Sequence, residues 1–99
     1  MGKRKIVVRQ SVAESIAKIA WYIESKGFVA TAEKFSDDVY DFINRLADDR
    51  VMHSICKEPV RNLMGQKCKT FKKKYTIVFF ETFETITVCE FIPSKLIRW

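Results

Sequence analysis

Aromatic and β-branched residues concentrate in two neighbouring runs near the end of the chain, at residues 75–82 and 85–92. This composition is typical of strands, and the break at residues 83–84 predicts a hairpin. Within the first run every position from residue 77 to residue 80 is apolar, so both faces of this strand are hydrophobic. A strand covered on both faces lies in the middle of a sheet. We therefore expect the hairpin to be the centre of the fold.

Two helices are predicted before the hairpin from apolar residues at a spacing of three and four. A β-branched run at residues 5–9 predicts a short strand, after which Ser11 and Glu14 form an S-x-x-E capping box that begins the first helix. This helix is expected to end near Lys26 and Gly27. Its apolar stripe consists of Val12, Ile16, Ile19, Ala20 and Ile23.

The second predicted helix follows a short connection at residues 28–30, and Thr31 is its expected N-cap. Two helices joined by so few residues run antiparallel. The outer face of the second helix alternates acidic and basic residues, which is typical of a solvated surface. Its apolar stripe consists of Ala32, Phe35, Val39, Phe42, Ile43 and Leu46.

Residues 48–66 lose this periodicity and contain Pro59 and Gly65, which predicts an irregular connection with one helical turn. Residues 68–72 then form a strand that leads into the hairpin. The order β-α-α-β-β-β predicts an α+β fold, with a helical hairpin packed on a small, mostly antiparallel sheet, as one domain over residues 1–99. Six apolar residues of the connection are expected to fold back on the core: Val51, Met52, Ile55, Val60, Leu63 and Met64.

Charge and cysteine content narrow the classes of partner and compartment. The chain has 18 Lys and Arg against 12 Asp and Glu, a net charge of +6. This excess favours a polyanion or an acidic protein as partner, and the alternative is that it serves only solubility. Three irregularly spaced cysteines argue against a disulfide framework and for a reducing, cytoplasmic location. The apolar run at residues 6–8 is too short for a secretory signal or a membrane span.

Cationic side chains with one or two proton carriers are the parts that metal-independent RNA cleavage requires. Such a site positions the 2′-OH for attack on the adjacent phosphate and stabilises the charge that develops there. The candidate proton carriers are His53 and Tyr75, although a single histidine in a loop is more often a surface residue. The candidate cations are Arg61, Lys69, Lys72, Lys74, Lys95 and Arg98.

Neither a metal ion nor a small-molecule cofactor is expected. His53 and Cys56 form an H-x-x-C pair, but a structural zinc site needs four ligands and only Cys68 and Cys89 remain to complete it. Cys89 lies among apolar residues of a predicted strand and is expected to be a small buried side chain. The chain has no glycine-rich phosphate loop and no nucleophile elbow.

Binding of nucleic acid without catalysis is an alternative function for the same region. Its lysines and aromatic residues are interleaved, as in proteins that contact a phosphate backbone and stack on bases. A second interpretation is that the lysines protect a sheet edge against aggregation. The residues concerned are Lys67, Lys69, Phe71, Lys72, Lys73, Lys74 and Tyr75.

The chain resembles the RelE/ParE superfamily of toxins from bacterial type II toxin–antitoxin systems over nearly its whole length. The resemblance lies in the helical segment IAKIAWYIESKGFVATAEKF, the stretch from Pro59 to Gly65, the hairpin opening KKYTIVFF and the closing FIPSKLIRW. It implies a fold with two antiparallel helices and a terminal meander. It also implies a cytoplasmic protein that is neutralised by an acidic antitoxin.

This superfamily contains both ribosome-dependent mRNA endonucleases and DNA gyrase poisons on one fold. By position, Lys72, Lys74 and Lys95 match the cations that stabilise the scissile phosphate in the endonucleases. The chain departs from their pattern at Thr76, where an arginine normally follows Tyr75, and in the closing basic pair, which is reduced to a single lysine. The helical hairpin around Trp21 and Tyr22 is more similar to the gyrase-directed branch. The alternative from a different class is a non-catalytic nucleic-acid-binding or protein-interaction module, a decayed toxin.

Overall fold

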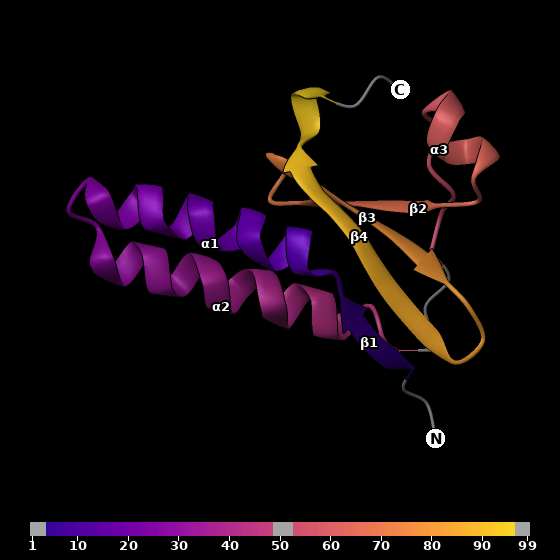
Figure 1. Cartoon of the computed structure of the whole chain (residues 1–99), viewed down its shortest axis with the longest axis horizontal. Coiled ribbons are helices and arrows are strands. Elements are labelled where there is room, and N and C mark those ends of the chain that lie inside the picture. Colours follow the sequence, from indigo (N-terminus) through magenta and orange to yellow (C-terminus); the bar gives the residue numbers. More distant parts are fainter. Residues whose placement is uncertain (1–3, 49–52, 97–99) are drawn as a thin grey trace.

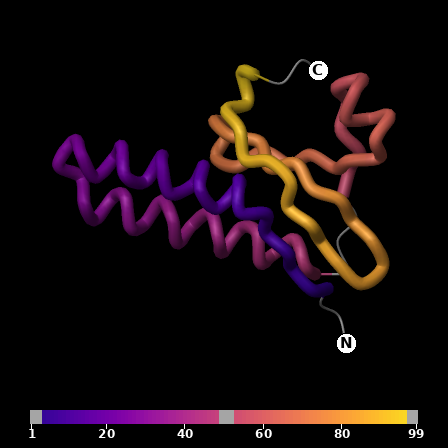
Figure 2. Tube along the Cα trace, viewed as in Figure 1, coloured from indigo at the N-terminus to yellow at the C-terminus, as the bar shows by residue number. Residues whose placement is uncertain are grey.

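The predicted hairpin forms the centre of a four-stranded sheet in the computed structural model, which describes residues 4–48 and 53–96 (Figure 1). The strand order is β1-β4-β3-β2, in which β1 runs parallel to β4 and the other pairs are antiparallel. The tube in Figure 2 shows the first strand beside the last one, so segments near the two ends of the chain are neighbours. The elements in chain order are β1 (Lys5–Val8), α1 (Gln10–Ser25), α2 (Val29–Arg45), α3 (Pro59–Leu63), β2 (Lys67–Phe71), β3 (Tyr75–Glu81), β4 (Thr85–Pro93) and the 3₁₀ turn η1 (Ser94–Leu96).

The α+β prediction is confirmed, because the antiparallel helices α1 and α2 pack on one face of this sheet (Figure 1). Ile77 and Phe79 of β3 and Ile86 and Val88 of β4 face the two helices with the period of two of a strand. A register shift in the pairing of β3 with β4 then brings Phe91 to the same face. Burying each large apolar side chain in such a core contributes roughly 1.5–3 kcal/mol. The shared core consists of Val12, Ile16, Val39, Ile43, Leu46, Phe71, Ile77, Phe79, Ile86, Val88 and Phe91.

The opposite face of the sheet has its own small apolar cluster, which confirms that β3 is covered on both sides. Val78 is 0% exposed there and packs with Cys56, Cys68 and Ile92. The pairing of β3 with β4 shifts register beside Val78, where a β-bulge lies. A bulge bends its strand and increases the local twist.

Both predicted helix N-caps are wrong. The first helix begins at Gln10, ahead of Ser11, and its N-cap is Arg9 with no side-chain cap bond. The backbone N–H of Arg9 donates to the carbonyl of Val88 on β4 at 3.2 Å. This bond fixes Arg9 at the end of β1, and the helix begins at the next residue. The second helix likewise begins two residues ahead of Thr31.

None of the helices in residues 4–48 and 53–96 combines the length and hydropathy needed to cross a bilayer.

The end of α1 is where the sequence predicts it. Lys26 is the C-cap, and Gly27 follows with φ of +90°. A residue with a side chain adopts this left-handed conformation only with strain, which explains the glycine.

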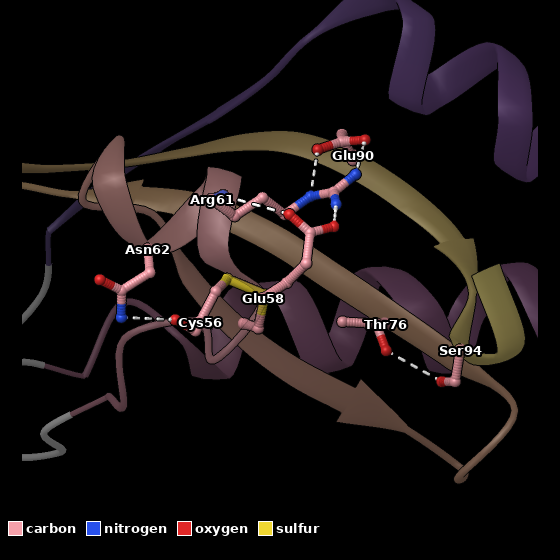
Figure 3. Close-up of a disulfide and its surroundings, with 8 residues drawn as sticks. Cys56, Glu58, Arg61, Asn62, Thr76, Glu90 and Ser94 are labelled. Carbon is pink, nitrogen blue, oxygen red and sulfur yellow. Dashed lines mark hydrogen bonds and ion pairs between the residues drawn. A yellow bond between two sulfur atoms is a disulfide. The ribbon is translucent and has the colours of Figure 1, made fainter. Parts of the chain in front are cut away.

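The expectation of no disulfide is also wrong, because Cys56 and Cys68 are bonded to each other (Figure 3). The connection before α3 runs back along β2, where the N–H of Cys56 donates to the carbonyl of Gln66 at 2.9 Å. This pairing brings the two Cα atoms to 4.8 Å, within the range that a disulfide requires. Cys89 is a free and buried thiol, as predicted.

The connection between α2 and β2 contains one short helix, as predicted, but its apolar residues do not fold back on the core. Val60, Leu63 and Met64 are 65%, 87% and 56% exposed, and Ile55 is 44% exposed. The sheet face beneath α3 is already filled by the disulfide cluster, so a five-residue helix has no further surface on which to bury them. Val51 and Met52 lie outside the described residues.

Candidate nucleic-acid interface

The turn between β2 and β3 consists of three lysines in an unusual backbone conformation. Lys72 and Lys73 have φ of 50° and 62°, and the N–H of Lys74 closes the turn on the carbonyl of Phe71 at 3.2 Å. Left-handed backbone at a residue with a side chain costs roughly 1–2 kcal/mol. Glycine or asparagine is preferred at such positions. The lysines are therefore present at a cost in stability.

A pocket of about 410 Å³ lies beside this turn, where β3 begins and β4 ends. The N–H of Ser94 donates to the carbonyl of Lys74 at 2.8 Å and joins its two sides. Three of the lining side chains are cations and none is a carboxylate, so the pocket suits an anion such as a phosphate. We call it the basic pocket; it is lined by Lys73, Lys74, Tyr75, Pro93, Ser94 and Lys95.

The basic pocket brings together four of the residues predicted as site residues, Lys73, Lys74, Tyr75 and Lys95. Sequence reasoning missed Ser94. Its Oγ lies 2.9 Å from the Oγ1 of Thr76, a side chain that is 0% exposed (Figure 3). Either hydroxyl can be the donor of this bond; when Thr76 donates, the hydroxyl hydrogen of Ser94 is available to an anion in the pocket. The position directly before Lys95 was the only sequence signal for Ser94.

Tyr75 is the candidate proton carrier that lies at the basic pocket. Its ring stacks on Phe91 with a centroid distance of 4.9 Å and an interplanar angle of 16°. Phe35 packs edge-on against the same ring at 5.8 Å. These contacts restrict the ring, so the orientation of the tyrosine at the pocket is set by the core.

His53 does not lie at the basic pocket. The alternative of a surface histidine is also wrong, because its side chain is only 2% exposed. Its ring packs edge-on against Phe79 at 5.2 Å, and its Nε2 lies 3.2 Å from the carbonyl of Leu46 and 3.8 Å from Glu81. Arg4 pairs with the same glutamate. The histidine belongs to a buried polar cluster at the far end of β3.

Lys72 does not line the basic pocket and pairs with the helical hairpin. Its Nζ lies 2.8 Å from the Oδ2 of Asp38 on α2, and Lys34 donates to the same oxygen at 2.9 Å. These two bonds, the one from Lys72 first, lower the pKa of Asp38. Of the three lysines matched by position to the superfamily, only Lys74 and Lys95 line the pocket.

Acid is expected to release this tie between the β2–β3 turn and α2. A carboxyl group with a lowered folded pKa stabilises the fold above its unfolded pKa, and this contribution is lost as pH falls through the folded value. For Asp38 that window lies below its ordinary pKa of 3.8. The urea midpoints of wild type and Asp38→Asn, which differ at neutral pH, should therefore converge in acid. A difference that stays constant down to about pH 2 would contradict the assignment.

Arg61 is fully paired within the protein and lies apart from the basic pocket. Its Nε and Nη2 donate to the two carboxylate oxygens of Glu90 at 2.9 and 2.8 Å, and Glu58 pairs with Nη1. The bonds to Glu90 raise the pKa of the guanidinium. Two carboxylates neutralise the charge of this arginine. Its role in the structure is therefore to join α3 to β4, and it is not a phosphate contact.

The other predicted binding residues lie along the sheet edge. Lys69 extends from β2 over the ring of Phe42 on α2, with its Nζ 5.9 Å from the ring centroid. Lys67 is bridged to Ile55 through the backbone. Arg98 lies outside the described residues.

No group of three or more His, Cys, Asp or Glu side chains in residues 4–48 and 53–96 has the arrangement of a metal site.

Comparison of the chain with protein-family models finds no match, and comparison with curated proteins finds none either.

Proposed function

We propose that this chain is the toxin of a type II toxin–antitoxin pair of the RelE/ParE superfamily, and that it cleaves mRNA on the ribosome without a metal ion. The observation that carries this proposal is the basic pocket, where Lys73, Lys74 and Lys95 surround about 410 Å³ with no carboxylate in the lining. A pocket of three cations and a hydroxyl donor suits the phosphate between two nucleotides. An acidic antitoxin is the expected partner, in keeping with the net charge of +6.

In this proposal the pocket stabilises the charge that develops as the 2′-OH attacks the adjacent phosphorus. Lys74 and Lys95 flank the phosphate from the β2–β3 turn and η1, and Ser94 donates a hydrogen bond. Each such donor or cation contributes roughly 10²–10³-fold to the rate. The bond from phosphorus to the 5′ oxygen breaks as the bond to the 2′ oxygen forms, which gives a 2′,3′-cyclic phosphate and a free 5′-OH. Tyr75, the candidate carrier at the pocket, donates its phenolic proton to the leaving 5′ oxygen, and the proton of the 2′-OH passes to solvent. Translation on the ribosome supplies the mRNA and orients it.

A cytoplasmic location is part of this proposal. The disulfide between Cys56 and Cys68 weighs against it, because cytosolic thiols are kept reduced in most organisms. A cytoplasmic location is consistent with this structure only if the chain also folds with Cys56 and Cys68 reduced. The stability of the reduced protein tests this.

Gyrase poisoning is the second candidate function, and a separate surface favours it. Trp21, Tyr22 and Phe28 are 71%, 59% and 60% exposed near the tip of the helical hairpin, which projects away from the sheet (Figure 1). Exposed aromatic side chains of this kind are enriched at protein interfaces. A protein target such as gyrase would be bound there, without use of the basic pocket.

The experiment that separates these functions is inducible expression in a bacterial host, followed by sequencing of RNA 5′ ends. Growth arrest with new 5′ ends inside translated codons is the expected result. Arrest with intact mRNA and damaged DNA would instead support gyrase as the target. Normal growth and intact mRNA would overturn both and leave the non-catalytic binding module, a decayed toxin.

A further inference from the structure

Ser94 is fixed at two points to the start of β3, beside the basic pocket. Its backbone N–H donates to the carbonyl of Lys74, the residue directly before β3, at 2.8 Å. Its Oγ lies 2.9 Å from the Oγ1 of Thr76, the second residue of β3 (Figure 3). Because both its backbone and its side chain are held, the serine hydroxyl has a defined place in the pocket wall without a ligand.

Burial decides which of the two hydroxyls donates. Thr76 is 0% exposed, and within residues 4–48 and 53–96 its hydroxyl has a hydrogen bond only with Ser94. If Ser94 donated, the hydroxyl hydrogen of Thr76 would be buried without an acceptor, which costs stability. Ser94 is half-buried and lines the pocket, so its own hydrogen can reach solvent or a ligand there. The bond therefore runs from Thr76 to Ser94.

This direction gives the basic pocket one more donor. Since the oxygen of Ser94 accepts from Thr76, its hydrogen is left for a group inside the pocket. The lysines that line the pocket have ammonium groups, which donate and cannot accept. A lining of this kind suits an anion whose free oxygens all accept, as those of a phosphodiester do.

We propose that Thr76 is a positioning residue of the basic pocket. By donating to Ser94, it leaves the hydroxyl hydrogen of the serine directed to the phosphodiester of a bound RNA. Thr76 does not line the pocket, so it acts only through Ser94. The inference rests on the proposed function for the identity of the anion, and it adds the residue that orients one of the donors.

Binding is measured with a dinucleotide that the protein cannot cleave. A 2′-O-methyl dinucleotide has one phosphodiester and no 2′-OH, so it reports on the pocket without the ribosome. Titration of the full chain, followed by the backbone amide NMR signal of Lys95, gives the dissociation constant. Ser94→Ala should weaken binding about tenfold, because a hydrogen bond to an anion is lost. Thr76→Val should weaken it about threefold to tenfold.

A double variant distinguishes positioning from a purely structural role. Because Thr76 acts through Ser94, Thr76→Val should weaken binding no further when residue 94 is already alanine. A purely structural loss would instead lower the affinity by the same factor in both backgrounds. Thr76→Ser keeps the hydroxyl and should bind within about twofold of wild type.

Thr70 provides the matched control. It lies opposite Thr76 in the pairing of β2 with β3, is exposed, and does not line the basic pocket. Thr70→Val makes the same chemical change on the neighbouring strand, so it should leave binding of the dinucleotide unchanged.

The urea midpoint tests the buried hydroxyl independently of any ligand. Ser94→Ala leaves the hydroxyl of Thr76 buried without a partner, which lowers stability. Thr76→Val removes that hydroxyl, so the double variant should have a higher urea midpoint than Ser94→Ala alone. Equal midpoints for these two proteins would contradict the direction assigned to the bond.

Three binding results would overturn the inference. The first is that Thr76→Val binds the dinucleotide as tightly as wild type. The second is that Thr76→Val weakens binding by the same factor with and without the serine hydroxyl. The third is that the dinucleotide does not bind the wild-type chain.

Cleavage in a translating extract separates this inference from the proposed function. Thr76→Val should lower the cleavage rate about tenfold, and Thr76→Ser should restore it. Cleavage that Thr76→Val leaves unchanged would refute the positioning role alone. Binding that depends on Thr76, in a wild-type chain that cleaves no mRNA, would refute the nuclease and support the positioning role at an anion site.

Discussion

Lys95→Ala is expected to lower the rate of mRNA cleavage in a translating extract by roughly 10²–10³-fold. The side chain is exposed, lines the basic pocket, and makes no ion pair within the described residues. It is therefore free to bind the phosphate, and its loss removes charge stabilisation that no neighbour replaces in full. The free energy of unfolding should change by no more than about 0.5 kcal/mol, as for most surface substitutions.

A second lysine provides the control for this variant. Lys18 is exposed on α1 and does not line the basic pocket, so Lys18→Ala removes the same charge from elsewhere. It should leave cleavage within about twofold of wild type, since exposed charges on distant surfaces are screened by salt. A folded Lys95→Ala protein that cleaves at the rate of Lys18→Ala would remove the lysine from the site.

Reduction of the disulfide between Cys56 and Cys68 is expected to lower the free energy of unfolding by about 3 kcal/mol. The bond closes a loop with a sequence separation of 12, and its main effect is to restrict the unfolded chain. This is a large part of the roughly 5–15 kcal/mol that holds a typical domain together. Urea unfolding with and without a strong reductant measures the difference directly.

The free thiol provides the control for the reduction experiment. Cys89→Ala leaves the disulfide in place, so reductant should lower its urea midpoint as much as it does for wild type. Equal midpoints for the oxidised and reduced protein would show that the bond adds no stability. A reduced protein that stays folded is required for the proposed cytoplasmic function, so this measurement bears on location as well.

The elements themselves were readable from the sequence because their signals are local. The apolar run at residues 77–80 predicted a strand buried on both faces, and Ile77, Val78 and Phe79 are all 0% exposed. The helical stripes predicted which sides of α1 and α2 enter the core. Periods of two and of 3.6 residues follow from backbone geometry, so they survive in any fold that buries one face of the element.

The helix starts could not be read in the same way. Ser11 and Glu14 have the spacing of a capping box, yet α1 begins earlier because Arg9 is already bonded to β4. A capping box sets the first residue of a helix only when the preceding chain is not fixed by other contacts. Here the sheet decides where the chain turns, and tertiary contacts override the local preference.

The sequence identified the lysines of the candidate site but not which of them lie together, because that also depends on tertiary contacts. The lysines near the β2–β3 turn were recognised as candidates from their density, and Lys95 by its position after the last strand. Periodicity alone does not show that Lys74 and Lys95 share one pocket while Lys72 pairs with Asp38 of α2. A turn directs consecutive side chains to different sides, and only the pairing of β3 with β4 brings the second lysine near.

Local sequence thus specified the strands, the helices, their buried faces and the basic character of the chain, because each is a property of neighbouring residues. The tertiary structure alone decided which distant groups meet: Cys56 with Cys68, Arg61 with Glu90, and His53 with the core around Phe79. It also left the aliphatic side chains of α3 exposed, since the sheet face beneath them was already filled. Such contacts depend on register and on the return of the connection along β2, which no periodic pattern encodes.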